Sequence, residues 1–207
     1  MKSKSDLINF IIQQHGFKSY LEIGVLNGHN FKQIQVEHKE SIDPNSKWPA
    51  TYKMTSERFF DSCVGQYKNK TYDVVFIDGS HLSEDAGSDA LNARRYLNPT
   101  YIIMHDCNPK KYEHQIRQRP RNGKSWYGDV WLAWVALRQT LPFLPMFVVD
   151  TDCGCGIIYN RIESRSAFTI TEDLTWESLQ ENRKEWLNLQ NIEYFKKFVE
   201  ERSNGMS

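Results

Sequence analysis

Short apolar segments alternate with amphipathic segments through the first two thirds of this 207-residue chain. The clearest apolar segment is Tyr72–Asp78 (YDVVFID), and similar segments cover residues 20–24, 41–43 and 101–106. Each has the length of a buried strand, and the segments between them place apolar residues at the three- and four-residue spacing of a helix face. This alternation predicts an α/β fold, in which helices cover both faces of a mainly parallel sheet.

Capping residues and periodicity place the helices and the end of the sheet. A first helix is expected from Ser5, as its N-cap, to Gly16, and Ser56 is expected to cap another helix. Further helices are expected at about residues 31–34, 83–97 and 129–139, and two more in the last forty residues. A terminal hairpin is expected at residues 147–150 and 156–159. Residues 1–160 are therefore expected to form one domain, against which a helical extension, residues 161–207, packs.

The charge balance argues against some classes of partner. Lysine and arginine number 26 and aspartate and glutamate number 26, so the formal net charge is zero. A protein dedicated to nucleic acids or to membrane surfaces would carry a basic excess. No segment has the apolar run of a signal peptide or of a membrane span. We therefore expect a cytoplasmic protein that binds neither nucleic acid nor membrane.

The four cysteines, Cys63, Cys107, Cys153 and Cys155, do not form a recognisable metal motif. Their spacing matches no zinc pattern, and Cys153 and Cys155 lack a second ligand pair and lie in an expected strand. In a cytoplasmic protein we expect four reduced thiols rather than a disulfide framework.

A turn with two glycines joins the first expected strand to its helix. The turn, Glu22–Gly28 (EIGVLNG), has the spacing GxxxG, which differs from the dinucleotide motif GxGxxG and lacks the GK[ST] ending of a P-loop. The acid before the glycines suits a ligand with a positive amino group. Asp43 ends the second strand 19 residues after Gly24, where an acid can bind two ribose hydroxyls. The glycines alone could be a structural turn, but together with Asp43 they favour an adenosine-type ligand.

Several motifs in order resemble those of the class I S-adenosylmethionine-dependent methyltransferases. They are YLEIGVLNG, SIDP, YDVVFIDGSH and IIMHD, followed by GDVW and DCGCGII, and the likeness covers about residues 18–160. The FIDGxH and HD motifs are similar to those of bacterial sugar and macrolide-sugar O-methyltransferases and, more distantly, of catechol O-methyltransferase. The resemblance implies a Rossmann-like sheet of seven strands, the last antiparallel. The implied cofactor contacts are Glu22, Gly24 and Gly28 with the methionine part, Asp43 with the ribose, Ser56 with the adenine, and Asp78.

Four ionisable side chains, Asp78, His81, His105 and Asp106, follow two of the expected strands. The carboxyl ends of neighbouring parallel strands meet at one edge of a sheet, so these groups are expected to converge on the ligand. A hydroxyl acceptor must lose a proton as the methyl group arrives, which requires a general base or a divalent cation. We expect His81 to be the base, because the unperturbed pKa of histidine is about 6.5. His105 and Asp106 complete the expected catalytic group.

A metal ion is a further expectation for these side chains. The resemblance places ligands of Mg²⁺ or Mn²⁺ at Asp78, His105 and Asp106. Metal-dependent relatives usually carry an acid at the position of His105, and magnesium prefers oxygen ligands. A histidine ligand would favour manganese, iron or zinc, or would mean that no metal binds. The sequence leaves these alternatives open.

A basic loop, residues 107–125, follows the second of these strands. It contains six lysines and arginines and a single acid, Glu113. Such a loop can close as a lid over an anionic acceptor, or it can be a solvated loop whose charges keep it soluble. The aromatic residues of the C-terminal extension predict core packing or, through its helices, a homo-oligomer surface.

The sequence therefore predicts an S-adenosylmethionine-dependent O-methyltransferase. Its expected acceptor is a hydroxyl group of a small polyhydroxylated molecule, a sugar or a glycoconjugate. Two alternatives remain, an N-methyltransferase on the same fold and a protein that binds S-adenosylmethionine without catalysis. Substitution of His81 distinguishes an N-methyltransferase from an O-methyltransferase. An amine acceptor does not need this base as strictly, so an N-methyltransferase would keep much of its activity.

Overall fold

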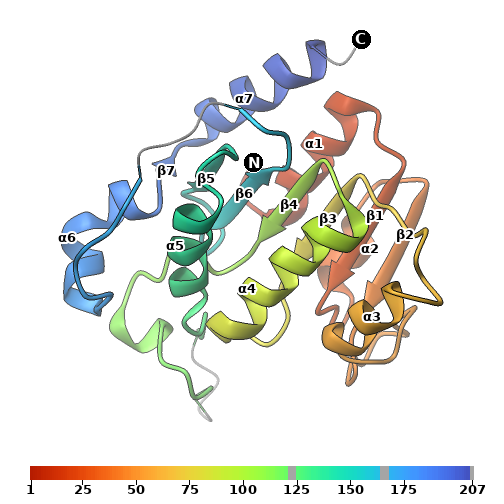
Figure 1. Cartoon of the computed structure of the whole chain (residues 1–207), viewed down its shortest axis with the longest axis horizontal. Helices are drawn as coiled ribbons and strands as arrows, with labels where there is room; N and C mark the ends of the chain where they lie inside the picture. Colours follow the sequence, from red (N-terminus) through yellow and green to blue (C-terminus); the bar gives the residue numbers. More distant parts are fainter. Residues whose placement is uncertain (121–124, 164–167, 206–207) are drawn as a thin grey trace.

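The computed structural model describes residues 1–120, 125–163 and 168–205. Within these residues, a sheet of seven strands forms the middle layer, and helices lie on both of its faces (Figure 1). The strands are β1 (Ser19–Ile23), β2 (His38–Ile42), β3 (Val74–Ile77), β4 (Tyr101–Met104), β5 (Met146–Val149), β6 (Cys155–Tyr159) and β7 (Leu189–Gln190). The helices are α1 (Lys4–His15), α2 (His29–Gln33), α3 (Ser56–Cys63), α4 (Ser83–Asn92), α5 (Val130–Thr140), α6 (Trp176–Trp186) and α7 (Ile192–Asn204).

The strand order is β2-β1-β3-β4-β6-β5-β7. Strand β1 pairs in parallel with β2 and β3, and β3 pairs in parallel with β4. Strand β6 is antiparallel to both β4 and β5, whereas β7 is parallel to β5. The predicted Rossmann-like sheet is confirmed. Its antiparallel strand, β6, is the last strand before residue 160, and the C-terminal extension supplies the seventh strand.

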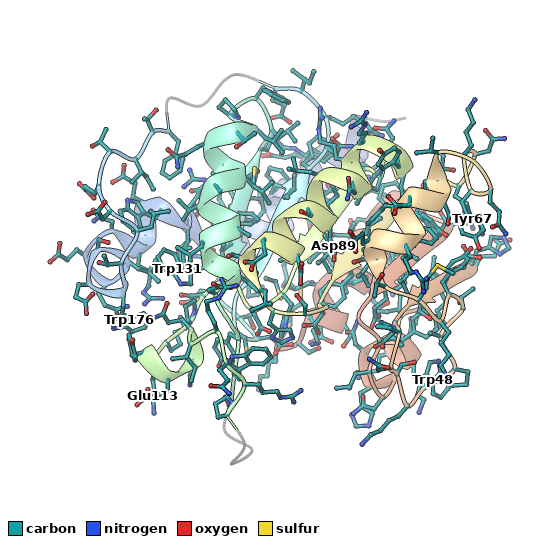
Figure 2. All side chains as sticks on the ribbon, turned by 60° about the horizontal axis from the view of Figure 1, so that its bottom comes forward. Trp48, Tyr67, Asp89, Glu113, Trp131 and Trp176 are labelled. Carbon is teal, nitrogen blue, oxygen red and sulfur yellow. The ribbon has the colours of Figure 1, made fainter. Side chains whose placement is uncertain are left out.

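Alternate residues of each strand pack into two separate apolar layers. On β3, Val75 and Ile77 belong to the layer beneath α3, α4 and α5. Val74 and Phe76 belong to the opposite layer, beneath α1 and α7. Trp131 on α5 is fully buried in the first layer (Figure 2). Because both faces of the sheet are covered, its central strands β3 and β4 are apolar throughout, and this made them recognisable in the sequence.

The N-caps of α1 and α3 differ from the expected residues. The N-cap of α1 is Ser3 rather than Ser5. Helix α3 is capped by Thr55, whose hydroxyl accepts a hydrogen bond from the Arg58 N–H, so Ser56 is the first helical residue. Serine and threonine cap helices about equally well, so the backbone conformation decides between neighbouring candidates.

Two further expectations need correction. The helix expected at residues 83–97 is α4 followed by a π-helical turn, Ala93–Leu97. Cys153, expected in a strand, lies in the turn between β5 and β6 with a φ of 65°. This turn is five residues long, from 150 to 154, because β5 ends at Val149 and β6 begins only at Cys155.

The C-terminal extension contacts the rest of the chain through α6, β7 and α7. Strand β7 joins the sheet beside β5, and α7 packs against α1. Phe195 and Phe198 of α7 and Trp186 of α6 are buried, so these aromatic residues serve core packing. A homo-oligomer surface on these helices stays a prediction. Among the described residues, no helix combines the length and the apolar character that crossing a membrane requires.

Candidate active site

Polar side chains gather where the chain changes its direction of winding along the sheet. From β1 the chain moves to β2 on one side, and it then continues to β3 on the other side of β1. Such a reversal opens a crevice beyond the carboxyl ends of the strands. The two larger cavities found at this end among the described residues have volumes of about 340 Å³ and about 600 Å³. Both are lined by Gly24, Asp43, Gly79 and Ser80.

The turn after β1 requires glycine because other chain segments approach it closely. Gly24 has a φ of 87°, and a Cβ atom there would lie 2.1 Å from the carbonyl oxygen of Asp78. Gly28 has a φ of 74°, and a Cβ atom there would lie 2.7 Å from the Trp48 ring. Any other residue at either position would have to displace its neighbours. The two predicted glycines therefore keep the turn compact beside the cavities.

The smaller cavity has Asp43 on its wall. Asp43 is 9% exposed, and its two carboxylate oxygens accept hydrogen bonds from the N–H groups of Leu26 and Asn45, both at 2.8 Å. Ser56, at the start of α3, and Asp89, on α4, line the same cavity. Burial raises the pKa of Asp89 to about 7. Asp43 and Ser56, which the sequence assigned to one ligand, therefore face one cavity.

The larger cavity has Glu22 on its wall. Glu22 is 2% exposed, and its Oε2 accepts hydrogen bonds from the Tyr20 hydroxyl at 2.6 Å and from the Asn30 amide at 2.9 Å. Burial raises the pKa of Glu22 to about 7, although these two hydrogen bonds favour the carboxylate. Both of these donors are neutral, so a positively charged ligand group would stabilise the ionised form.

Asp78 follows β3 directly and pairs with Lys4 from α1. The Lys4 Nζ lies 2.6 Å from Asp78 Oδ2, and the two side chains are 23% and 15% exposed. Burial lowers the pKa of Lys4, but the charge and the hydrogen bond of Asp78 outweigh it and raise the pKa. Burial likewise raises the pKa of Asp78, but the charges of His105 and Lys4 help to hold it well below its usual value. The N-terminal helix thus brings a fixed positive charge to the end of β3.

His81 lies between two carboxylates. Its Nδ1 is 2.9 Å from Asp106 Oδ2, and its Nε2 is 3.4 Å from Asp78 Oδ1. The imidazole stacks on Trp126, with ring centroids 4.9 Å apart and planes inclined by 3°. Burial lowers the pKa of His81, but Asp106 and Asp78 outweigh burial and raise the pKa to about 9. His81 thus holds its proton more tightly than the unperturbed value predicts.

His105 and Asp106 follow β4 and are 7% and 3% exposed. His105 Nδ1 lies 3.3 Å from Asp78 Oδ1 and 3.2 Å from Asp106 Oδ1. Burial lowers the pKa of His105, but the two carboxylates raise it well above its usual value. Among the described residues, neither ring nitrogen of His105 nor Nδ1 of His81 makes an aligned hydrogen bond. The four side chains expected to converge do so, at ion-pair distances but with poor hydrogen-bond alignment.

Two groups of three side chains at this edge have the spacing of metal ligands. Donor atoms of Asp78, His81 and Asp106 lie within 4.8 Å of one another. Donor atoms of His105, Asp152 and Cys153 form the second group with the same limit. The sequence grouped His105 with the two carboxylates, and its Nδ1 does lie beside them.

Backbone strain is concentrated at the same edge. Positive φ angles occur at His81 (62°), Asp106 (61°), Asp152 (41°) and Cys153 (65°). Such conformations cost on the order of 1–3 kcal/mol for non-glycine residues and persist where the surrounding structure imposes them. Gly128 packs closely against the strained backbone of His81, because a Cβ atom at residue 128 would lie 1.8 Å from the His81 carbonyl oxygen.

Acidic side chains partly neutralise the basic loop. Arg117 forms ion pairs with Glu84 and Asp129, whereas Arg119 lines the larger cavity. The basic residues that the loop carries within positions 121–124 lie outside the described residues. Arg117 thus has a structural role, and the lid stays a prediction.

Three residues at the site were not foreseen from the sequence. Lys4 belongs to the first helix and has no local motif that links it to Asp78, 74 positions away. Asp152 lies in a turn whose position depends on the sheet. Asp89 did leave a signal, because it lies three residues after Ala86 on the buried side of α4, where an acid is unusual.

A comparison with protein families finds a match for the segment that carries most of this site. Residues 12–107, which run from α1 through β4, match the methyltransferase domain family. This segment, slightly less than half of the chain, is similar to a methyltransferase domain, and the sheet has the methyltransferase fold. The matched segment contains the glycine turn, Asp43, Asp78, His81 and the His105–Asp106 pair. No curated protein sequence matches the chain significantly.

Solved structures with low sequence identity share the fold of this chain. A candidate caffeoyl-CoA O-methyltransferase from Staphylococcus aureus is 20% identical, with 77% of this chain and 82% of that chain covered and a TM-score of 0.54. A candidate O-methyltransferase from Klebsiella pneumoniae is 15% identical, with coverages of 78% and 80% and a TM-score of 0.54. An O-methyltransferase from Bacillus cereus in complex with SAH is 15% identical, with coverages of 75% and 78% and a TM-score of 0.51.

Proposed function

We propose that this protein is an S-adenosylmethionine-dependent methyltransferase that transfers a methyl group to a hydroxyl group of a small polyhydroxylated acceptor. The observation that carries the proposal is the position of His81 between Asp78 and Asp106, on the wall of the larger cavity. The sulfonium of S-adenosylmethionine supplies the methyl group and leaves as a neutral thioether. The acceptor hydroxyl must lose a proton in the same step, so a general base at this wall contributes to the rate.

The two cavities divide the cofactor between them in this proposal. Asp43 and Ser56, on the wall of the smaller cavity, would bind the ribose hydroxyls and the adenine. Gly24 and Gly28 would lie beside the methionine part, and Glu22, on the wall of the larger cavity, would bind its amino group. Pairing of that positive group with the Glu22 carboxylate would offset the cost of burying the charge.

His81 receives the acceptor proton, and Asp78 and Asp106 orient its ring. Trp126 covers one face of the imidazole, so the ring has little freedom to turn away from the cavity. Because Asp106 and Asp78 raise the pKa of His81 to about 9, the ring must release its own proton before it can act. A positively charged cofactor beside these carboxylates favours that release, because it competes with the imidazolium for their negative charge.

The same carboxylates could also hold a divalent cation, as the sequence predicted. The oxygens of Asp78 and Asp106 suit Mg²⁺ or Mn²⁺, and an imidazole beside them shifts the preference towards manganese. The unaligned ring nitrogens of His81 and His105 fit such a role. Lys4 already neutralises Asp78 and would compete with the ion. A bound cation would lower the pKa of the acceptor hydroxyl.

The lining of the larger cavity supports a polar acceptor of modest size. Its volume of about 600 Å³ must hold both the methionine part of the cofactor and the acceptor. Hydrogen-bonding side chains on its wall include Lys4, Asn27, His29, Asn30, Ser80, Arg119, Ser125 and Tyr127. A sugar or a glycoconjugate has the density of hydroxyl groups that such a wall can bind. Arg119 would favour an acceptor that carries an anionic group.

The first experiment is a thermal-shift titration with S-adenosylmethionine and S-adenosylhomocysteine, each with EDTA, Mg²⁺ or Mn²⁺. A ligand at about 100 times its Kd adds about 2.7 kcal/mol to the free energy of unfolding. For a chain of this size we expect Tm to rise by about 5–10 °C with either cofactor. A further rise with a metal ion that is lost in Asp106→Asn would support metal-assisted chemistry. No shift with either cofactor would contradict the cofactor placement.

Acceptors are then compared by the release of S-adenosylhomocysteine, with free sugars, glycosides, a catechol and primary amines as the panel. A methyl ether on a sugar hydroxyl, identified by mass spectrometry, is the expected product. Methylation of amines alone would support the N-methyltransferase alternative. Cofactor binding without S-adenosylhomocysteine release from any acceptor would support a binding protein without catalysis.

A further inference from the structure

The turn between β5 and β6 brings two metal-ligating side chains to the end of β4. Strand β6 runs antiparallel to β4, so residues 150–154 lie beyond the carboxyl end of β4. The Asn108 N–H donates a hydrogen bond to the Cys153 carbonyl at 3.0 Å and ties the turn to the chain that leaves β4. Asp152 and Cys153 thereby lie beside His105, although nearly fifty residues separate them in the sequence.

The spacing of these three side chains suits one metal ion. His105 Nε2 lies 3.7 Å from Asp152 Oδ1, and donor atoms of His105, Asp152 and Cys153 all lie within 4.8 Å of one another. Ligands at about 2.0–2.3 Å from a tetrahedral zinc ion stand roughly 3.5 Å apart. The second Asp152 oxygen accepts a hydrogen bond from the Lys4 N–H at 2.7 Å, which holds the carboxylate in place.

The hydrogen bonding of His105 independently points to a ligand. The residue is 7% exposed, and neither of its ring nitrogens makes an aligned hydrogen bond within the described part of the chain. A buried donor or acceptor without a partner is costly, so such a group in a native site calls for a missing partner. The other nitrogen, Nδ1, faces Asp78 and Asp106. Metal-bound imidazoles commonly have carboxylates on that side.

We propose that His105, Asp152 and Cys153 form a binding site for a zinc ion. The thiolate and the carboxylate together balance the two positive charges of the ion, and the imidazole binds in its neutral form. Sulfur bonds to zinc as the Cys153 thiol releases its proton to solvent. The thiolate also sets this site apart from the Asp78 and Asp106 carboxylates, because magnesium prefers oxygen.

The proposed site has an open position next to the reaction cavity. Three protein ligands leave one tetrahedral position for water or another small ligand, as in zinc sites that are not purely structural. His105 and Cys153 both line the larger cavity, so this position is accessible from it. The positive φ angles of Asp152 and Cys153 agree with a turn held in a functional conformation.

Cobalt absorption tests the proposal on the metal-free, full-length protein without cofactor or acceptor. Bound Co²⁺ is expected to give a near-ultraviolet thiolate-to-cobalt charge-transfer band and strong visible bands of tetrahedral geometry. Equimolar Zn²⁺ should abolish both sets of bands, whereas Mg²⁺ in tenfold excess should not. Absence of the charge-transfer band in the wild type, or its loss with Mg²⁺, would overturn the proposal.

Cys153→Ser is expected to lose the charge-transfer band, and Asp152→Asn to weaken cobalt binding at least tenfold. Cys63→Ser is the matched control, because Cys63 lies on α3, and it should retain the band. The Tm of each variant confirms folding. A band that persists in Cys153→Ser would contradict the assignment.

Alkylation provides a second readout that needs no variant. Zn²⁺ should protect Cys153, the partly exposed cysteine of the turn, from iodoacetamide, with mass spectrometry locating the modified residue. Equal labelling with and without Zn²⁺ would contradict the site. Neither experiment involves methyl transfer, so their failure is distinguishable from failure of the proposed function.

Discussion

Two clusters of charged and polar side chains lie beside the sheet, and their hydrogen bonding differs. The Glu40 cluster consists of Glu40, Tyr52, Lys70 and Tyr72, near β2 and the start of β3. The His81 cluster consists of Lys4, Asp78, His81, His105 and Asp106, at the carboxyl ends of β3 and β4. Each cluster combines at least one carboxylate with at least one cation, but only the Glu40 cluster is saturated with hydrogen bonds.

In the Glu40 cluster every donor points at the carboxylate. Lys70 Nζ donates to both Glu40 oxygens at 2.7 Å, and the hydroxyls of Tyr52 and Tyr72 also donate to them. Burial raises the pKa of Glu40, but these hydrogen bonds outweigh it and lower the pKa. A carboxylate satisfied in this way stabilises the fold and has little capacity left for a ligand.

In the His81 cluster the ion-pair distances range from 2.6 to 3.4 Å, and three buried imidazole nitrogens have no aligned hydrogen bond among the described residues. Unsatisfied hydrogen-bonding capacity therefore separates a cluster that can bind a ligand from a structural one. This difference predicts that changes in the His81 cluster or its cavity affect cofactor binding and turnover, whereas changes in the Glu40 cluster affect stability.

The largest effect is expected for His81→Asn. Loss of a general base typically lowers the rate by about 100-fold or more, and turnover with a hydroxyl acceptor at saturating cofactor should fall accordingly. Asparagine tolerates a positive φ, so Tm should change little. His38→Asn, at an exposed position, is the control and should retain full turnover. Unchanged turnover in His81→Asn would exclude His81 as the base.

A smaller effect is expected for Asp43→Asn. The amide presents one acceptor oxygen in place of two, so one contact to the ribose hydroxyls is lost, and the Kd for S-adenosylhomocysteine should rise about tenfold, or about 1.4 kcal/mol. Isothermal titration calorimetry measures this change. Asp61→Asn, on the exposed side of α3, should leave the Kd unchanged. An equal Kd in wild type and Asp43→Asn would place the ribose elsewhere.

A pH dependence is expected from Glu22, whose pKa burial raises to about 7. Only the carboxylate pairs with the cofactor amino group, so affinity for S-adenosylmethionine should increase up to about tenfold from pH 6 to pH 8. Glu22→Gln should bind more weakly and lose this dependence. Calorimetric titrations of both proteins across this range measure it, and parallel pH profiles would contradict the pairing.

Glu22 should also affect the stability of the protein without cofactor. The folded pKa of about 7 exceeds the usual value of 4.5, so the folded state binds the proton more tightly than the unfolded state. Stability is therefore expected to decrease as the pH rises from about 4.5 to about 7. Denaturant unfolding at pH 8 should find Glu22→Gln more stable than the wild type. A less stable variant would show that the carboxylate itself supports the fold.

The smallest effect is expected for Glu40→Gln, and it should appear in stability alone. The Glu40 side chain is 27% exposed, so solvent screening limits the loss to about 1 kcal/mol, or about 2–4 °C in Tm. The depressed pKa of Glu40 means that this contribution is present above pH 4.5 and is lost at lower pH. Glu37→Gln, at an exposed position, is the control. A changed Kd for the cofactor in Glu40→Gln would contradict the proposed difference between the two clusters.

Much of the site could be predicted because strand ends are visible in the sequence. Asp78, His105 and Asp106 directly follow apolar segments, and parallel strands bring their carboxyl ends to one edge. The same reasoning did not reach Lys4 and Asp152, because α1 and the β5–β6 turn meet the cluster only through packing across the sheet. It also expected Cys153 in a strand, since apolar character alone does not show where a strand turns.

The sequence by itself determined the alternation of strands and helices, the glycine turn and the identity of the groups at the strand ends. These features depend on local conformation and on burial, which act on neighbouring residues. Only the tertiary structure decided the alignment of the ionisable groups, their pKa values and the approach of Lys4, Asp152 and Cys153. Ionisation and hydrogen bonding depend on distance, direction and burial in three dimensions, and segments far apart in the chain set all three.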